Sequence, residues 1–258
     1  MQKYWVFFLQ NVHDFLIYRV RLLLVVVSEF VAPLVMIWLF TGLAARHVSG
    51  MTKEQLLSYY LFTSILFLFT HSNIDSFVST AIQHGELAGY LVKPLHFWLV
   101  AFIKDFSSRI LKLIIGLPFF IVLVVVYSKF SFHFSVFDLI TTLAIITLSF
   151  LLSFALAFSL GLLTFWVEEV WGFQNLEEVM VALLGGVALP YQFFPIWLQK
   201  FLQFTPFPYL VNWAVRKGFT GNLLFEFMMA MIWLFILSNL AIWMWKKGIK
   251  KYSALGTY

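Results

Sequence analysis

The chain is organised as long apolar segments separated by short polar ones. An apolar stretch of about 20 residues crosses a bilayer as one helix, and the pattern predicts six such spans. We place the spans at 22–44, 56–78, 110–128, 138–166, 171–189 and 223–245. The span at 138–166 is the most uniform, because residues 139–167 contain no Asp, Glu, Lys or Arg. The pattern therefore predicts an all-α polytopic membrane protein with a single transmembrane domain, 1–258.

The segment before the first span, 1–21, mixes bulky apolar residues with polar and charged ones. Both kinds recur at three- and four-residue steps, which predicts an amphipathic helix lying in the membrane interface. The alternative is that this segment is only the frayed start of the first span. Because His13, Asp14 and Arg19 interrupt the segment, we expect no cleaved signal peptide.

Two connections have patterns that differ from simple loops. The polar connection 79–109 is long enough for a helix parallel to the membrane, and Pro94 ends a compact polar–apolar segment within it. Such a helix can dock a soluble partner, and the alternative is a solvated linker. The region 190–215 is rich in aromatic residues, and 190–208 holds four of the seven prolines. It is too broken for one helix and too apolar for an aqueous loop, so we predict an outward re-entrant helical hairpin.

Composition narrows the class of protein. The chain is 62% hydrophobic and 11% charged, whereas an ordinary soluble domain is about 25% charged. Too few charges remain to cover a water-exposed surface, which excludes a soluble enzyme, a nucleic-acid-binding domain and a disordered tail. The chain has no cysteine, which excludes disulfides, thiol nucleophiles and thiolate metal sites. Six spans leave no room for a soluble domain of about 100 residues.

Charge predicts the orientation. Six crossings place both termini on one side, and eleven of the 17 Lys and Arg residues fall on that side. These eleven are Lys3, Arg19, Arg21, Lys93, Lys104, Arg109, Lys112, Lys246, Lys247, Lys250 and Lys251. The positive-inside rule therefore places both termini, including the tail 246–258, in the cytoplasm. The re-entrant region 190–215 then faces outward.

Ionisable residues within the spans are candidate functional groups. His71, Asn73 and Asp75 near the inner end of 56–78 suggest a proton relay or an ion site. The alternative is that Asp75 caps a helix or pairs near the interface. Glu29 is a further candidate, or it pairs with a basic residue of the interfacial helix. There is no phosphate-binding Gly-Lys-Ser/Thr loop and no metal-binding motif, so we expect neither ATPase activity nor a metal site in this chain.

The order of these features resembles the membrane subunit of a type-2 ABC exporter, the ABC-2-type permease family. Residues 84–95, His-Gly-Glu-Leu-Ala-Gly-Tyr-Leu-Val-Lys-Pro-Leu, are similar to the coupling segment of that family. The run 189–198, Leu-Pro-Tyr-Gln-Phe-Phe-Pro-Ile-Trp-Leu, followed by Thr205-Pro206-Phe207 and 216–221, is similar to its re-entrant hairpin. The interfacial helix and the basic end complete a resemblance that covers essentially the whole chain and looks closest to a small bacterial branch.

The resemblance implies a machine of two permeases and two ATPase subunits. The ATPases would bind ATP and Mg²⁺, so no cofactor is expected in this chain. Their closure would push the coupling helices, shift the two permeases against each other and open a path between them. The contact residues implied are His84, Gly85, Glu86, Leu87, Tyr90, Leu91, Lys93 and Pro94, with Glu168 and Glu169 as a second contact. The outward gate region would contain Pro190, Phe194, Pro195, Trp197, Pro206 and Phe207.

The aromatic outward half favours an amphipathic or hydrophobic cargo, such as a lipid, a lipid-linked glycan or a natural product. The second permease is either identical or paralogous, and membrane lipid is an expected partner, whereas nucleic acid is not. One alternative is an ion- or proton-coupled secondary transporter that uses Asp75, His71 and Glu29. Another is an intramembrane enzyme or an assembly factor.

Overall fold

The computed structural model describes residues 2–17, 53–127, 136–216 and 222–252, together with scattered positions between 20 and 39. Glu29 and much of the predicted first span, 22–44, lie outside the described residues. Within the described part the regular structure is helical and contains no strand. The predicted all-α class is therefore confirmed for that part of the chain.

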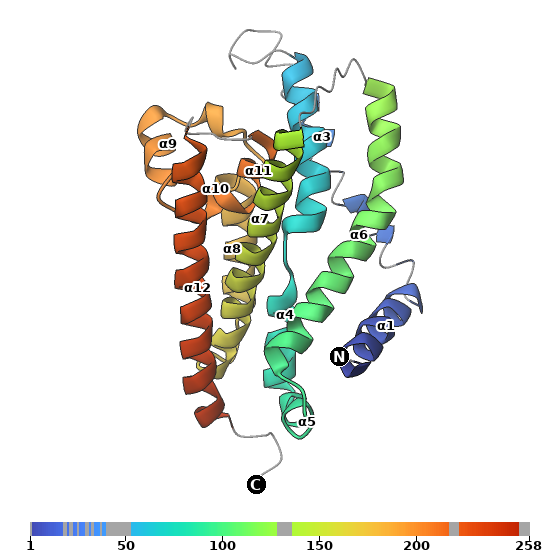
Figure 1. Ribbon diagram of the computed structural model, residues 1–258, viewed down its shortest axis with the longest axis vertical. Helices are drawn as coiled ribbons and strands as arrows, with labels where there is room; N and C mark the ends of the chain where they lie inside the picture. Colours follow the sequence, from blue (N-terminus) through green and yellow to red (C-terminus); the bar gives the residue numbers. More distant parts are fainter. Residues whose placement is uncertain are drawn as a thin grey trace.

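The long helices run along the long axis of the molecule, and short helices occupy its two ends (Figure 1). The long ones are α3 (Lys53–Thr70) with α4 (Ile74–Gln83) below it, α6 (Phe97–Tyr127), α7 (Val136–Leu162) and α12 (Leu223–Lys251). The helix α1 (Gln2–Ile17) packs obliquely beside α6, and α5 (Leu87–Leu91) lies at the lower end. Near the upper end are α9 (Ile196–Leu202), α10 (Phe207–Leu210) and α11 (Asn212–Arg216).

Three helical stretches of the described chain are long and apolar enough to cross a bilayer, namely Glu54–Gln83, Ile140–Phe165 and Leu223–Lys251. They overlap the predicted spans 56–78, 138–166 and 223–245, whereas the complete six-crossing topology stays a prediction. The helix α8 (Trp171–Leu184) ends before 189, the predicted end of the fifth span. Its 14 residues reach roughly 21 Å at 1.5 Å per residue, less than a bilayer core.

The connection predicted at 79–109 is much shorter in the structure, because both flanking helices extend into it. The helix α4 continues to Gln83 and α6 begins at Phe97. Two charged residues of the predicted connection, Asp105 and Arg109, are buried inside the protein, where they are four residues apart and pair on one face of α6. Similarly, α12 extends into the predicted tail 246–258 and ends at Lys251.

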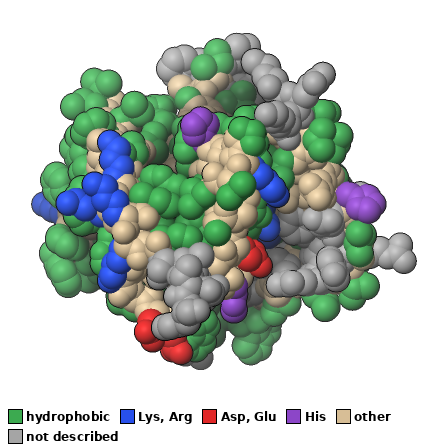
Figure 2. All heavy atoms as spheres, turned by 90° about the horizontal axis from the view of Figure 1, so that it is seen from below, with side chains coloured by type: hydrophobic (Ala, Val, Ile, Leu, Met, Phe, Trp, Pro, Cys, Tyr) green, Lys and Arg blue, Asp and Glu red, His purple; other side chains and the backbone are tan. Residues whose placement is uncertain are grey.

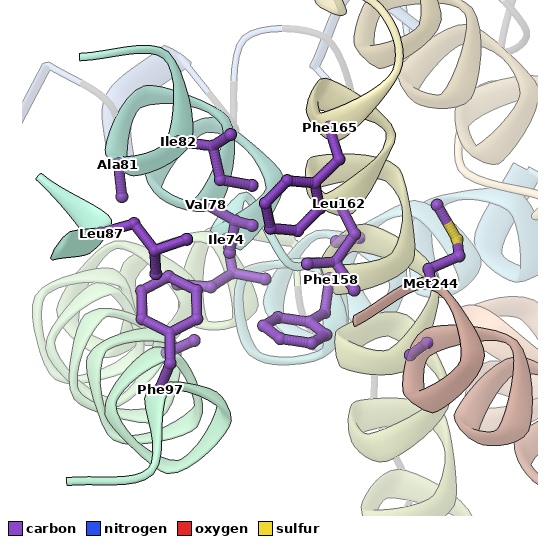
Figure 3. Packing of buried hydrophobic residues seen from close by; sticks show 13 residues of the cluster. Ile74, Val78, Ala81, Ile82, Leu87, Phe97, Phe158, Leu162, Phe165 and Met244 are labelled. Atoms are coloured by element: carbon purple, nitrogen blue, oxygen red, sulfur yellow. The ribbon is translucent and has the colours of Figure 1, made fainter. Parts of the chain in front are cut away.

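An apolar cluster at the lower end, here called the inner core, joins α4, α5, α6, α7 and α12. Figure 3 shows its side chains converging from these elements. Its members include Ile74, Val78, Ala81, Ile82, Leu87, Phe97, Phe158, Leu162, Phe165 and Met244. Because residues from five helices bury one another here, a displacement of α4 or α5 shifts the packing of the other helices at this end of the bundle.

The helices α4 and α7 cross at very close range at Gly161. A Cβ atom at this position would lie 2.6 Å from Val78 Cβ and 2.9 Å from the carbonyl oxygen of Asp75. Only glycine allows the two backbones to approach each other this closely. The crossing therefore fixes one point of α4 against α7.

A second apolar cluster, here called the outer core, surrounds α10 and α11. It contains Tyr209, Leu210, Val211 and Trp213 together with residues of α7, α8 and α12, such as Ile145, Val181 and Leu237. Above it on α3, Tyr59 and Tyr60 pack with Phe193 and Val215. Between the two cores, α3 gives way to α4 and the packing becomes polar.

Candidate functional site

The sequence-predicted coupling segment forms a protrusion at the lower end, residues 84–94, which we call the knob. The inner side of the knob is anchored in the inner core, where Leu87 is completely buried. The Tyr90 ring makes edge contacts with Phe77 and Phe97, with ring centroids 6.0 and 5.6 Å apart. Burial, and secondarily the charge of Glu86, raise the pKa of Tyr90, which keeps its hydroxyl neutral. The knob therefore has a packed base.

The outer side of the knob is open. His84, Glu86, Lys93 and Pro94 are exposed, and at its tip Leu91 and Val92 are 45% and 87% exposed. Gly85 has φ 77°, a left-handed conformation that glycine adopts easily and that turns the chain away from α4. The result is a polar rim and an apolar tip on a fixed base.

The knob lies next to the second predicted contact. The side-chain amide of Gln83 donates to the backbone carbonyl of Glu168, and the Gln174 amide donates to Ser79 Oγ at 3.3 Å. Glu168 and Glu169 are both exposed. Seen from below, this end carries basic, acidic and histidine side chains among apolar ones (Figure 2). The structure thus brings the two predicted contact segments together.

At the upper end, the chain leaves α8 through a non-helical stretch, residues 185–190, here called the outer break. Hydroxyl groups from α3 supply donors to its carbonyl groups: Tyr59 to Gly186 at 2.5 Å and Tyr60 to Ala188 at 3.0 Å. The backbone N–H of Asn212 donates to the Gly185 carbonyl at 3.1 Å. Irregular backbone inside a membrane protein requires such partners.

The re-entrant region itself consists of a 3₁₀ turn (Tyr191–Phe193) followed by α9, α10 and α11. Tyr209 donates to the Gln203 carbonyl at 2.6 Å, and Ser149 of α7 donates to the Tyr209 carbonyl at 2.7 Å. The predicted gate residues are spread over different environments. Pro190 and Pro206 are buried, Phe194 and Phe207 are half-buried, and Pro195 and Trp197 are exposed.

Residues 71–73, between α3 and α4, form what we call the inner break. The backbone N–H of His71 still donates to the Phe67 carbonyl at 2.9 Å. The next donor is diverted, because the Ser72 N–H donates to Ser153 Oγ of α7 at 3.0 Å. The Ile74 N–H donates to Ser72 Oγ at 3.3 Å. Side chains therefore replace helical backbone partners at the inner break.

A buried guanidinium donates hydrogen bonds to the backbone carbonyl groups at the inner break. Arg109 Nη1 donates to the carbonyls of Thr70 at 2.6 Å and of Phe69 at 3.4 Å, and its guanidinium lies 4.1 Å from the centroid of the Phe150 ring. Asp105 forms the ion pair with Arg109 and accepts a hydrogen bond from Ser72 Oγ at 2.9 Å. Arg109 and Asp105 are 1% and 4% exposed. A buried charge is tolerated only when it is paired and hydrogen-bonded in this way.

The predicted intramembrane polar residues gather partly at the inner break. The Asn73 amide N–H donates to His71 Nε2 at 3.3 Å, and Asn73 Oδ1 accepts from Lys112 Nζ at 2.9 Å. His71 is buried and its ring stacks on Phe67. Asp75 lies separately in the first turn of α4, where the helix dipole favours a carboxylate. The described residues contain no group of three or more His, Asp or Glu arranged to hold a metal ion.

Sequence reasoning missed the centre of this polar layer, because Asp105 and Arg109 fell in the predicted connection 79–109 and Ser153 in an apolar span. The signal that identifies them is the four-residue spacing of Asp105 and Arg109 beside a long apolar run. The pairing with Ser72 could not be read from spacing, since it joins residues on different helices.

Long apolar helices, satisfied irregular backbone and a buried polar layer define a multi-pass membrane protein. Residues 23–256 match the sequence profile of a family described as ABC-2 family transporter protein. The chain therefore belongs to the ABC-2 transporter family, and it is a permease, the membrane component of an ABC transporter. The resemblance seen in the sequence is confirmed. Comparisons with curated proteins and with solved structures gave no match.

Proposed function

We propose that this permease works in an ATP-driven exporter and that its knob receives a separate ATPase subunit. The observation that carries the proposal is the combination of a completely buried base at Leu87 with an exposed rim at His84, Glu86 and Lys93. A push on an exposed loop with no packed base would be absorbed locally. A push on the knob reaches the inner core, because the knob and α4 share that core.

Glu168 and Glu169 provide the second contact of the same ATPase in this proposal. They are exposed beside the knob, and the Gln83 amide ties their segment to the end of α4. The ATPase binds ATP and Mg²⁺, and two ATPases act on two permeases. The chain itself contributes the moving surface and hydrolyses no nucleotide.

A second permease, identical or paralogous, covers α8 in this proposal. Leu176, Val179 and Leu183 recur at helical spacing and are all exposed, so they form an apolar stripe along one face of a helix too short to span alone. The translocation path then lies between the two permeases. The apolar and aromatic surface of this half supports an amphipathic or hydrophobic cargo.

The proposed orientation places the knob and both termini in the cytoplasm of a bacterial inner membrane. The exposed lysines Lys246, Lys247, Lys250 and Lys251 end α12 at the same end of the molecule as α5. Basic residues concentrate on the cytoplasmic side of membrane proteins. The re-entrant region at the opposite end then faces outward.

The proposal is tested by purifying the tagged chain from its native membrane in mild detergent and identifying the proteins that accompany it. We expect an ATPase subunit in stoichiometric amount. Glu86→Lys should weaken its retention, while Glu54→Lys, an exposed glutamate at the opposite end of the molecule, should not. Repeated isolation without an ATPase, together with transport that collapses with the proton gradient, would favour a secondary transporter using His71 and Asp75.

A further inference from the structure

We propose that Arg109 is a positioning residue for transport, which holds the inner break at a defined angle so that a displacement of the knob turns α4 and reaches α3. The proposal rests on the proposed role of the knob as the ATPase contact. The experiment below separates a failure of that role from a failure of this inference.

The stretch Glu54–Gln83 connects the two ends of the molecule. Its lower end, α4, leads directly into the knob and lies in the inner core. Its upper end, α3, carries Tyr59 and Tyr60, whose hydroxyls hold the outer break. Motion entering at the knob therefore has a continuous route to the re-entrant region, and the inner break lies in the middle of that route.

The inner break is suited to act as a hinge. In an unbroken helix, a change of angle stretches backbone hydrogen bonds. At residues 71–73 the Ser72 N–H is bonded to the side chain of Ser153, and the carbonyls of Phe69 and Thr70 are bonded to Arg109. Side chains follow a change of backbone angle through their own rotations, so few residues absorb the motion.

Arg109 sets the angle because it contacts several elements at once. Its guanidinium holds the carbonyl end of α3, also donates to the Phe150 carbonyl of α7 at 3.4 Å, and pairs with Asp105 on its own helix. Asp105 in turn holds Ser72 within the break. The guanidinium offers several donors in one rigid plane, which a flexible ammonium group does not.

The test measures the angle of the hinge as a distance. The chain has no native cysteine, so spin labels can be placed at introduced cysteines without background. Glu54→Cys with Thr80→Cys spans the inner break from two exposed positions. Leu224→Cys with Lys247→Cys is the matched control, because both positions are exposed on α12, which has no break. Distances are recorded by pulsed electron paramagnetic resonance in lipid nanodiscs, with the ATPase, without nucleotide and with Mg-ATP and vanadate.

We expect the 54–80 distance to shift between the two nucleotide conditions and the 224–247 distance to stay constant. The double variant Asp105→Asn with Arg109→Gln removes the ion pair without leaving one charge alone. It should broaden the 54–80 distance distribution and lose the nucleotide-dependent shift, while the bound ATPase continues to hydrolyse ATP. A purely structural ion pair would lower stability without separating hydrolysis from motion.

A milder pair of variants keeps the test decisive if the double variant folds poorly. Ser153→Ala removes the partner of the Ser72 N–H, whereas Ser159→Ala removes a buried hydroxyl that bonds only its own helix at Ala155. Ser153→Ala should broaden the 54–80 distribution relative to Ser159→Ala. Equal widths for these variants, or a wild-type shift no larger than that of the α12 control, would overturn the inference.

The two proposals fail in different ways. If no ATPase binds the chain, the proposed function fails, and the 54–80 width is then compared between wild type and double variant in the chain alone. A broader distribution in the double variant still supports Arg109 as the positioning residue of the break. An unchanged width overturns it.

Discussion

The inner and outer breaks solve one problem with different chemistry. The inner break separates α3 from α4 and the outer break follows the end of α8, and both leave backbone groups without helical partners. At the inner break the donor to the carbonyls is a charged guanidinium, Arg109, which needs Asp105 as a counter-charge. At the outer break the donors are the neutral hydroxyls of Tyr59 and Tyr60, which need none.

This difference implies different responses to damage. Removing a tyrosine hydroxyl takes away a neutral donor, so a backbone carbonyl is less well satisfied but no charge is left unpaired; for Tyr59 the contact with Asn212 Oδ1 at 3.2 Å is lost as well. Removing the guanidinium also leaves the Asp105 carboxylate buried without its ion-pair partner. The inner break should therefore tolerate very little change, whereas the outer break should weaken in small steps.

The largest effect is expected for Arg109→Met. It leaves the Asp105 charge buried and removes the donor to Phe69 and Thr70, so we expect a loss of roughly 3–5 kcal/mol in the free energy of unfolding. Denaturant unfolding in mixed micelles measures it. The double variant Asp105→Asn with Arg109→Gln should lose less. If Arg109→Met costs no more than Tyr59→Phe, the contrast between the two breaks is wrong.

Gly186→Ala should have the next largest effect. Gly186 has φ 83°, and a Cβ there would lie 2.8 Å from the Tyr59 hydroxyl oxygen. The left-handed conformation alone costs about 1–2 kcal/mol for an L-residue, and displacement of Tyr59 adds to it. The control is Gly172→Ala in α8, where a Cβ meets nothing within 4 Å. That control should be neutral or slightly stabilising by thermal unfolding.

Tyr59→Phe should cost about 1–3 kcal/mol, because it removes the donor to a buried carbonyl while keeping the ring. Tyr60→Phe should cost less, since its hydrogen bond is only partly buried. Proteolysis within 185–220 gives a local readout, and cleavage should increase more for Tyr59→Phe. If both variants were cleaved no faster than the wild-type protein, these hydroxyls would not hold the outer break.

The smallest value is expected for the coupling free energy between the two breaks, which is the difference between the stability loss of a double variant and the sum of the two single losses. Positions 59 and 72 are separated by roughly 20 Å of helix at 1.5 Å per residue, and the hydrogen bonds described above join them to different residues, Gly186 and Ser153. The stability losses of Tyr59→Phe and Ser153→Ala should therefore add within about 0.5 kcal/mol in a double-mutant cycle. A larger coupling energy would mean that the two breaks unfold as one unit.

Local signals in the sequence predicted the parts of the fold that depend on local chemistry. The prolines of 190–208 indicated the broken re-entrant region, and Pro94 marked the end of the segment that forms the knob. The long apolar runs predicted the helical class. These features need no knowledge of what packs against them.

The rest depends on partners that are distant in sequence. Lys104 and Arg109 belong to the predicted connection 79–109, yet the Lys104 ammonium lies 3.8 Å from the centroid of the Phe77 ring, and Arg109 is buried against Asp105. The inner break contains neither glycine nor proline. It forms where α6 and α7 offer better partners than the helix itself, which no periodicity reveals. Tyrosines 59 and 60 counted as apolar residues, although their hydroxyl groups hold the outer break.

The close crossing at Gly161 gives α4 the geometry of a lever with a fixed fulcrum. Gly161 faces the stretch of α4 from Asp75 to Val78. The middle of this stretch is about 10 Å along the helix from Gln83 and about 4 Å from Ile74 at 1.5 Å per residue. A tilt about this fulcrum therefore moves the end at the inner break in the opposite direction to the end at the knob, and by less than half as much.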